Sequence, residues 1–166
     1  CPLVDRTHPD FAALKVLVTV LGGYFGSRLM SNIREEKGYT YGINASIASF
    51  PFQGYLAIGT ETDNEYVEPC IREVKYEMRR LQEELIPEQE LSMVKNYMIG
   101  EMCRNYEDPF SLSDAWIFVK TAGLENNFFQ TLAEKIRRVK AEELRDLAFR
   151  YFQSENMIEV VAGKKM

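Results

Sequence analysis

The feature of this sequence that most constrains its fold is a pair of short segments with a two-residue period. Within residues 41–48, apolar or aromatic side chains occupy every second position, which is the pattern of a β-strand. Residues 51–54 have the composition of a turn, and residues 55–60 have the pattern of a second strand. Because so short a link cannot make a parallel crossover, we expect an antiparallel hairpin.

Helical patterns flank this hairpin on both sides. Before it, one helical face collects five apolar residues, Phe11, Leu14, Leu17, Val18 and Leu21. Gly22 and Gly23 end that helix, and a short second helix is predicted over about residues 27–36. After the hairpin, about ninety residues carry the helical period, and a last strand is predicted over residues 157–162.

The first helix after the hairpin has the clearest apolar stripe. Its members recur at steps of four and three: Val67, Ile71, Val74, Met78, Leu81 and Leu85. The stripe spans too few heptads for a coiled coil, so a helix that faces the core is the better interpretation. It predicts that Ile71, Val74 and Met78 are buried together.

The order of elements is helix, helix, strand, strand, several helices, strand. Strands and helices do not alternate regularly, which argues against a Rossmann-like sheet. The sequence predicts an α+β fold, an antiparallel sheet with several helices packed on one face, in a single domain over residues 1–166. Three strands make a small sheet for so many helices, which leaves room for a first strand before Cys1 in the intact protein.

Composition limits the classes of binding partner and the cellular compartments that we expect for this chain. The formal net charge of −5 argues against nucleic acid, whose binders need clustered lysine and arginine. No apolar run is long enough for membrane insertion. Cys1, Cys70 and Cys103 form no C-x-x-C motif, so three reduced thiols favour a reducing, cytoplasmic compartment. The start without methionine leaves a lost leader open, and with it a periplasmic or organellar location.

Catalytic residues are hard to find in this chain. A catalytic zinc needs about three protein ligands, and helical zinc motifs place two histidines one turn apart. The only histidine, His8, precedes a proline at a helix start, where a structural or solvated role is expected. The glycine-rich residues 22–27 follow a helix and lack the ending of a P-loop. We therefore expect no metal, no cofactor and no catalytic residue in this chain.

One stretch carries a recognisable pattern. It runs Leu-Gly-Gly-Tyr-Phe-Gly-Ser-Arg-Leu-Met-Ser-Asn-Ile-Arg-Glu-Glu-Lys-Gly-Tyr-Thr-Tyr-Gly over residues 21–42. This segment resembles the one shared by M16 peptidase domains, of the pitrilysin and mitochondrial-processing type. Residues 8–14, 90–95 and 158–163 also resemble family positions, so the resemblance extends over nearly the whole chain.

The resemblance implies a particular half of an M16 enzyme. In this family two homologous halves enclose a chamber, and the first half carries His-x-x-Glu-His and the zinc. The second half lacks that motif and supplies an arginine and a tyrosine, seven residues apart, that contact the peptide substrate. Arg34 and Tyr41 match that pair in spacing and setting. The chain is thus expected to bind and position peptide for a zinc-bearing half, in the same polypeptide or in a separate subunit.

Three alternatives stay open. Arg34 could be an exposed residue at a helix end, and Tyr41 a strand aromatic in the core. The chain could also be a structural subunit, because core subunits of the respiratory bc1 complex have the same fold without catalysis. A stand-alone peptide-binding module is the third.

Overall fold

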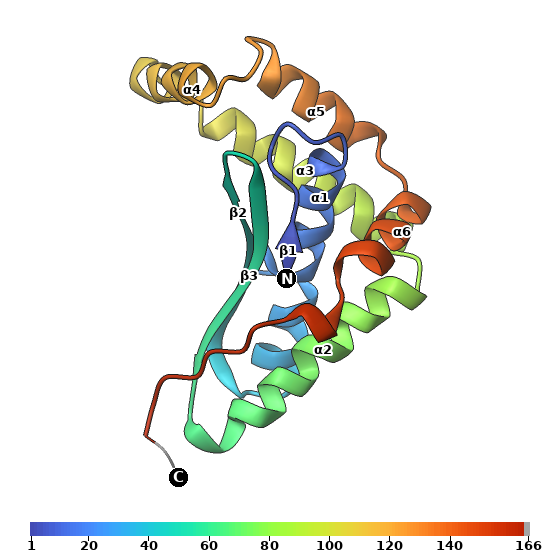
Figure 1. The fold of residues 1–166 in the computed structure, drawn as a ribbon. Coiled ribbons are helices and arrows are strands. Elements are labelled where there is room, and N and C mark those ends of the chain that lie inside the picture. Colours follow the sequence, from blue (N-terminus) through green and yellow to red (C-terminus); the bar gives the residue numbers. More distant parts are fainter. Residues whose placement is uncertain (165–166) are drawn as a thin grey trace.

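The computed structural model describes residues 1–164 as three strands on one side and a set of helices on the other (Figure 1). The strands are β1 (Pro2–Leu3), β2 (Thr40–Phe50) and β3 (Gln53–Thr62). The α-helices are α1 (Phe11–Gly22), α2 (Val67–Glu83), α3 (Glu88–Arg104), α4 (Pro109–Thr121), α5 (Phe128–Arg138) and α6 (Ala141–Tyr151). A π-helix, η1 (Met30–Glu36), precedes β2, and the 3₁₀ turns are η2 (Asn64–Tyr66) and η3 (Ser154–Asn156).

The sheet has the strand order β1-β3-β2, and every pairing is antiparallel. The predicted hairpin is therefore confirmed, with strands longer than their alternating patterns. Phe50 pairs with Gln53, so the loop contains only Pro51 and Phe52. Phe52 takes a φ of 74°, which is the left-handed conformation that such a tight loop requires at this position.

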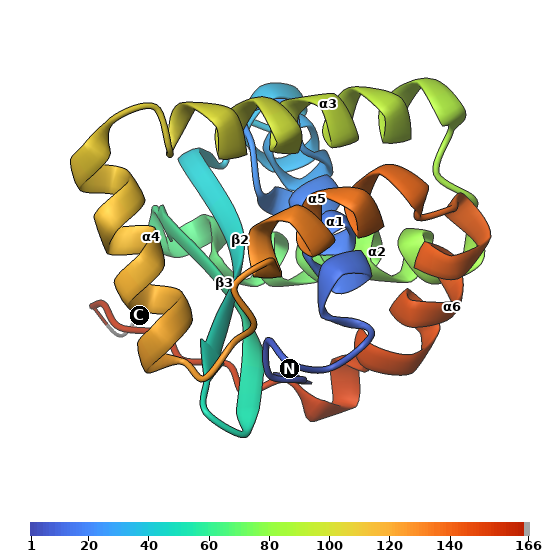
Figure 2. The ribbon, with the colours of Figure 1, turned by 90° about the horizontal axis from the view of Figure 1, so that it is seen from above.

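Most of the helices lie on one side of the sheet, as predicted for an α+β fold, while α4 lies apart from them near the tip of the hairpin (Figure 1). Seen from above, α1 lies at the centre, with β2 on one side and α3, α5 and α6 around it (Figure 2). Nine of the twelve residues of α1 are buried, which makes it the central element of the core.

Gly22 explains how the end of α1 can lie so close to the sheet. A Cβ atom at this position would stand 2.7 Å from the Cβ of Ala45 and 2.8 Å from its backbone nitrogen. Any larger residue would push α1 away from β2. The first glycine of the Leu-Gly-Gly motif is thus a packing requirement.

The apolar stripe of α2 is only partly covered. Val74, Met78 and Leu81 are buried, with exposed fractions of 7%, 1% and 0%. Ile71 is only partly buried, so the prediction of its burial with Val74 and Met78 was wrong. The reason is positional, because Ile71 lies on the floor of an open groove beside β3.

The predicted last strand is also wrong, since residues 157–162 form no strand. This segment runs past the lower half of β3 without joining the sheet (Figure 1). It is held by side chains instead: Lys75 Nζ lies 2.6 Å from Glu159 Oε1, and Asn64 Nδ2 donates to the Lys164 carbonyl at 3.1 Å. A strand needs a neighbouring backbone to pair with, and β1 is too short to supply one.

Candidate functional site

Arg34 lies in the last turn of the π-helix η1. The N–H of Lys37 donates to the Asn32 carbonyl at 3.1 Å, which is the i+5 bond of this rare helix type. Ile33 anchors the element, because its side chain is fully buried. Gly38, with a φ of +67°, ends it. Single π-turns are frequent at functional sites, so the setting of Arg34 is unusual in itself.

Tyr41 lies on the surface, because the register of β2 shifts between Thr40 and Ile43. In a regular strand, Tyr41 would share the buried face with Ile43, as the two-residue period predicts. At this bulge, Thr40 and Ile43 are both buried, and the Tyr41 side chain is fully exposed. The Thr40 hydroxyl oxygen accepts from Gly42 N at 3.1 Å, which supports the irregular backbone.

The two predicted residues meet at this end of the sheet. Arg34 Nε donates to the Tyr41 carbonyl at 3.0 Å. The guanidinium carbon of Arg34 also lies 4.6 Å from the centre of the Phe25 ring. Phe25, a residue that the sequence analysis did not single out, is itself 64% exposed. The backbone bond and the ring together fix the direction of Arg34 and leave the Tyr41 phenol in solvent.

An open groove of about 790 Å³ adjoins this pair, between the end of the hairpin and η2. Acidic side chains, Glu35, Glu61 and Asp63, lie along it. Tyr39 and Tyr66 stack there with ring centres 4.8 Å apart. The pKa of Tyr66 is raised, chiefly by the neighbouring Glu65 carboxylate, so its phenol stays protonated at neutral pH. The groove thus offers aromatic surface and hydrogen-bond donors rather than a nucleophile.

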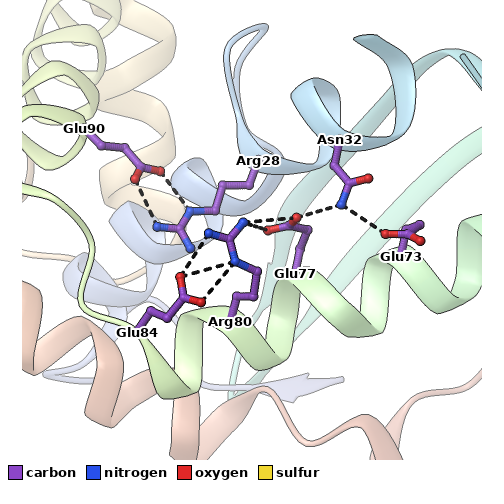
Figure 3. A network of polar contacts seen from close by, with 7 residues as sticks. All are labelled: Arg28, Asn32, Glu73, Glu77, Arg80, Glu84 and Glu90. Atoms are coloured by element: carbon purple, nitrogen blue, oxygen red, sulfur yellow. Dashed lines mark hydrogen bonds and ion pairs between the residues drawn. The ribbon is translucent and has the colours of Figure 1, made fainter. Parts of the chain in front are cut away.

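A network of polar side chains binds η1 to the neighbouring helix α2 (Figure 3). Asn32 Nδ2 donates to Glu77 Oε1 at 2.7 Å and to Glu73 Oε2 at 3.1 Å, so η1 is bound to α2. Glu77 is only 2% exposed, and Arg80 Nη1 lies 3.3 Å from its second oxygen. A buried carboxylate needs such partners, which is why this contact orders the π-helix.

A second contact binds the residues just before η1 to α3. Arg28 Nε and Nη2 donate to the two oxygens of Glu90, both at 3.0 Å. Such a fork is strongly directional. The sequence signal for this network is Glu77, an acidic residue inside the buried face of α2, three residues after Val74.

No donor set for zinc is found in residues 1–164. Within that range, no three His, Cys, Asp or Glu side chains are grouped as a metal ion requires. His8 lies at the start of α1, where its Nδ1 accepts from the Asp10 N–H at 3.2 Å. The residues described do not fit a zinc site.

Over residues 1–164, no helix combines the length and the apolar character of a membrane span.

The family follows from a direct comparison. The family model described as "Peptidase M16 inactive domain" matches residues 1–98, which is more than half of the chain. The chain therefore belongs to the M16 inactive-domain family. It is an inactive domain of the C-terminal type from this family of zinc proteases.

Individual relatives agree with this placement. A Helicobacter pylori protein named "Non-peptidase homolog YmxG" is 31% identical over 162 residues, which are 94% of this chain and 36% of that protein. The chain thus spans little more than a third of this curated relative. An M16 inactive domain from Pseudomonas fluorescens has a TM-score of 0.80 at 22% identity, covering 89% of this chain and 35% of that one. A chain of complex III2 from Candida albicans has a TM-score of 0.72 at 18% identity, covering 89% and 37%. At these identities, the two structures show the shared fold alone.

Proposed function

We propose that residues 1–166 form a single non-catalytic domain that binds peptide and positions it for cleavage by a zinc-bearing M16 half. That half is part of the same polypeptide or a separate subunit. The observation that carries this proposal is the contact between the partly exposed Arg34 and the fully exposed Tyr41 at one end of the sheet. A core tyrosine would be buried, whereas the Tyr41 side chain is fully exposed.

The chemistry of the pair supports the proposed role. Arg34 lines the groove and uses its Nε on the Tyr41 backbone, and within residues 1–164 its two terminal nitrogens make no hydrogen bond. Nη1 has only a long contact to Glu35, at 3.9 Å. A guanidinium and a phenol can both donate to a peptide carbonyl oxygen, and donors held in place beforehand act best on charge that develops during reaction.

The test uses the complete protein together with its zinc-bearing half and a peptide substrate. Tyr41→Phe is the cleaner variant, because Arg34 contacts the Tyr41 backbone and not its phenol. If the pair acts on the transition state, Tyr41→Phe and Arg34→Ala lower kcat and kcat/KM together, on the order of 10²-fold for one preorganised donor. If it only holds the peptide, KM rises and kcat stays.

Matched controls lie elsewhere on the same domain. Tyr55→Phe alters a half-exposed tyrosine at the far end of the hairpin, and Arg104→Ala alters an exposed arginine of α3. Both should leave the kinetics unchanged. A double variant of Arg34 and Tyr41 with wild-type kinetics and wild-type stability would refute the proposed site.

The same experiment separates the alternative function, a structural or assembly subunit. The name of the Helicobacter pylori relative, "Non-peptidase homolog", favours that alternative for the relative itself. If the complete protein and every candidate zinc-bearing partner cleave no peptide, while Arg34→Ala weakens assembly with that partner, the structural role replaces the catalytic one.

A further inference from the structure

A groove of about 970 Å³ lies between α1, β2 and α4, on the side of the sheet that faces the helices. Its β2 wall is formed by residues 45–47 and 49, toward the hairpin tip, where Figure 1 shows α4. It shares no residue with the groove beside Arg34 and Tyr41. A space of this size is within the range of small-molecule sites, so the chemistry of its walls indicates what it can hold.

One wall of this groove is a continuous row of aromatic rings. The Tyr106 and Phe129 ring centres are 4.8 Å apart, and those of Phe129 and Phe128 are 5.3 Å apart. Phe118, from α4, continues the row with its ring centre 6.4 Å from that of Phe128. All four rings are left partly uncovered, and Phe118 is 37% exposed. Aromatic surface of this kind is covered favourably by an aromatic or branched apolar group.

The charged side chains that line the groove are mainly cationic. Lys15 lies there as the one charged residue of α1. Arg6 and Arg104 line it as well, but the charge of Arg104 is offset by an ion pair with Glu101, whereas Arg6 is hydrogen-bonded only to uncharged oxygens. Among the residues described, Asp114 is the single carboxylate that lines the groove. The groove therefore keeps an excess of positive charge, which favours an anionic ligand.

Two hydrogen-bond donors in the groove have no acceptor. Within residues 1–164, neither Lys15 Nζ nor the Tyr106 hydroxyl makes a hydrogen bond, although both residues line the groove. Desolvation alone lowers the pKa of Lys15 and raises the pKa of Tyr106, so no neighbouring charge offsets the desolvation of either group. An anionic oxygen is the acceptor that an ammonium in this setting lacks.

We propose that this groove binds a carboxylate that carries an aromatic or branched apolar body, with the carboxylate at Lys15 and the body against the row of rings. Lys15 is the anchor because Arg6 is already held in place, by Ser49 and by the Phe118 ring, whose centre lies 4.6 Å from the guanidinium carbon. Two sources supply this chemistry: a free aromatic acid, and the C-terminal phenylalanine or tyrosine of a peptide.

Calorimetric titration of the complete protein with phenylacetate tests the proposal. We expect saturable binding. Two matched compounds separate the two halves of the ligand: acetate lacks the ring, and phenylacetamide lacks the charge. Each should bind about tenfold more weakly or worse, because one loses the contact with the aromatic row and the other loses the charge-assisted bond to Lys15.

A pair of lysine variants assigns the binding to this groove. Lys15→Met should weaken phenylacetate binding by about tenfold or more, since it removes the cationic partner of the carboxylate. It replaces a desolvated ammonium by an apolar side chain of similar length, so the variant is expected to fold. Lys140→Met changes an exposed lysine outside the groove and should leave the affinity unchanged.

A peptide probe distinguishes the two sources of the carboxylate. Acetyl-glycyl-phenylalanine is compared with its C-terminal amide. Tighter binding of this peptide than of phenylacetate, with loss on amidation and in Lys15→Met, assigns the groove to a peptide C-terminus. Tighter binding of phenylacetate, also lost in Lys15→Met, assigns it to a free acid.

Three outcomes overturn the proposal. The first is the absence of saturable binding of both phenylacetate and the free-acid peptide at millimolar concentration. The second is equal affinity of wild type and Lys15→Met for whichever probe binds. The third is binding that is lost in Tyr41→Phe and kept in Lys15→Met, which would place the probe in the groove beside Arg34 and Tyr41. None of these outcomes bears on the cleavage kinetics that test the proposed function.

Discussion

Helices α1 and α4 are both rich in apolar residues, yet they have opposite surroundings. In α1, nine of twelve residues are buried between the sheet and the other helices (Figure 2). In α4, only Val119 is buried, while Phe110, Trp116 and Ile117 are between 51% and 82% exposed. Apolar composition alone therefore does not tell which helix forms the core. The place of each helix in the chain topology decides this.

The attachment of α4 explains the difference. It is joined to the rest of the molecule along one side, by the buried Val119 and by the Phe118 ring. The Phe118 ring lies 6.2 Å from that of Phe129 and 6.4 Å from that of Phe128. The guanidinium carbon of Arg6 lies 4.6 Å from its centre. Helix α1, by contrast, contacts β2, α3, α5 and α6. We expect substitutions in the two helices to differ accordingly.

The largest effect is expected in α1. Leu17 is fully buried, so Leu17→Ala should lower the free energy of unfolding by about 2–5 kcal/mol, through lost burial and the cavity left behind. The matched change in α4, Leu112→Ala, removes a side chain that is 53% exposed and should stay within about 0.5 kcal/mol. Urea unfolding followed by circular dichroism measures both. Equal losses of stability in the two variants would contradict the conclusion that α1 forms the core and α4 does not.

An intermediate effect is expected at Ile71, between these extremes. Full burial would predict a loss as large as that at Leu17. Because Ile71 is only partly buried, Ile71→Ala should cost about 1 kcal/mol. The same urea titration measures this cost, and a loss as large as that of Leu17→Ala would contradict the partial burial of Ile71.

Much of the fold was predictable because it follows from local periodicity. The hairpin, the helix over α1 and the buried face of α2 are repeating patterns in which neighbouring residues carry the signal. The family segment over residues 21–42 also located Arg34 and Tyr41 at one end of the hairpin. Arg34 and Tyr41 come into contact because only three residues separate the end of η1 at Glu36 from the start of β2 at Thr40.

Other features of the fold and the site could not be predicted, because they depend on contacts between elements that are far apart in the chain. Residues 157–162 have a strand pattern, but pairing requires a backbone partner that β1 does not extend to supply. The bulge that exposes Tyr41 depends on Thr40 and its bonds to β3, and a two-residue period cannot reveal it. The network around Glu77 joins η1 to α2, and the separate Arg28–Glu90 pair joins the turn before η1 to α3, so no single segment contains these contacts (Figure 3).

The smallest effect concerns Lys15, the one charged residue of α1. Its side chain lies in an open groove of about 970 Å³ between α1, β2 and α4. Water still reaches it, but the surrounding protein atoms desolvate the ammonium, and this burial lowers the pKa of Lys15 below its ordinary value of 10.5. The other ionisable groups facing this groove are Arg6, Arg104, Tyr106 and Asp114. Lys15 thus faces a groove that residues of α1 and α4 both line.

The sign of the expected pH dependence follows from that lowered pKa. Below the folded-state pKa, the protonated ammonium destabilises the folded protein in full, because charging it is harder there than in the unfolded chain. As the pH rises from that pKa toward 10.5, the folded state loses its proton first and stability increases. Lys15→Met should therefore be slightly more stable than wild type at pH 7, and this advantage should shrink as the pH approaches 10. Urea midpoints at several pH values measure it, with Lys140→Met, an exposed lysine at the start of α6, as the control. An advantage that is constant with pH would mean that the methionine acts only through added apolar contact, and that the charge of Lys15 is not desolvated in the folded protein.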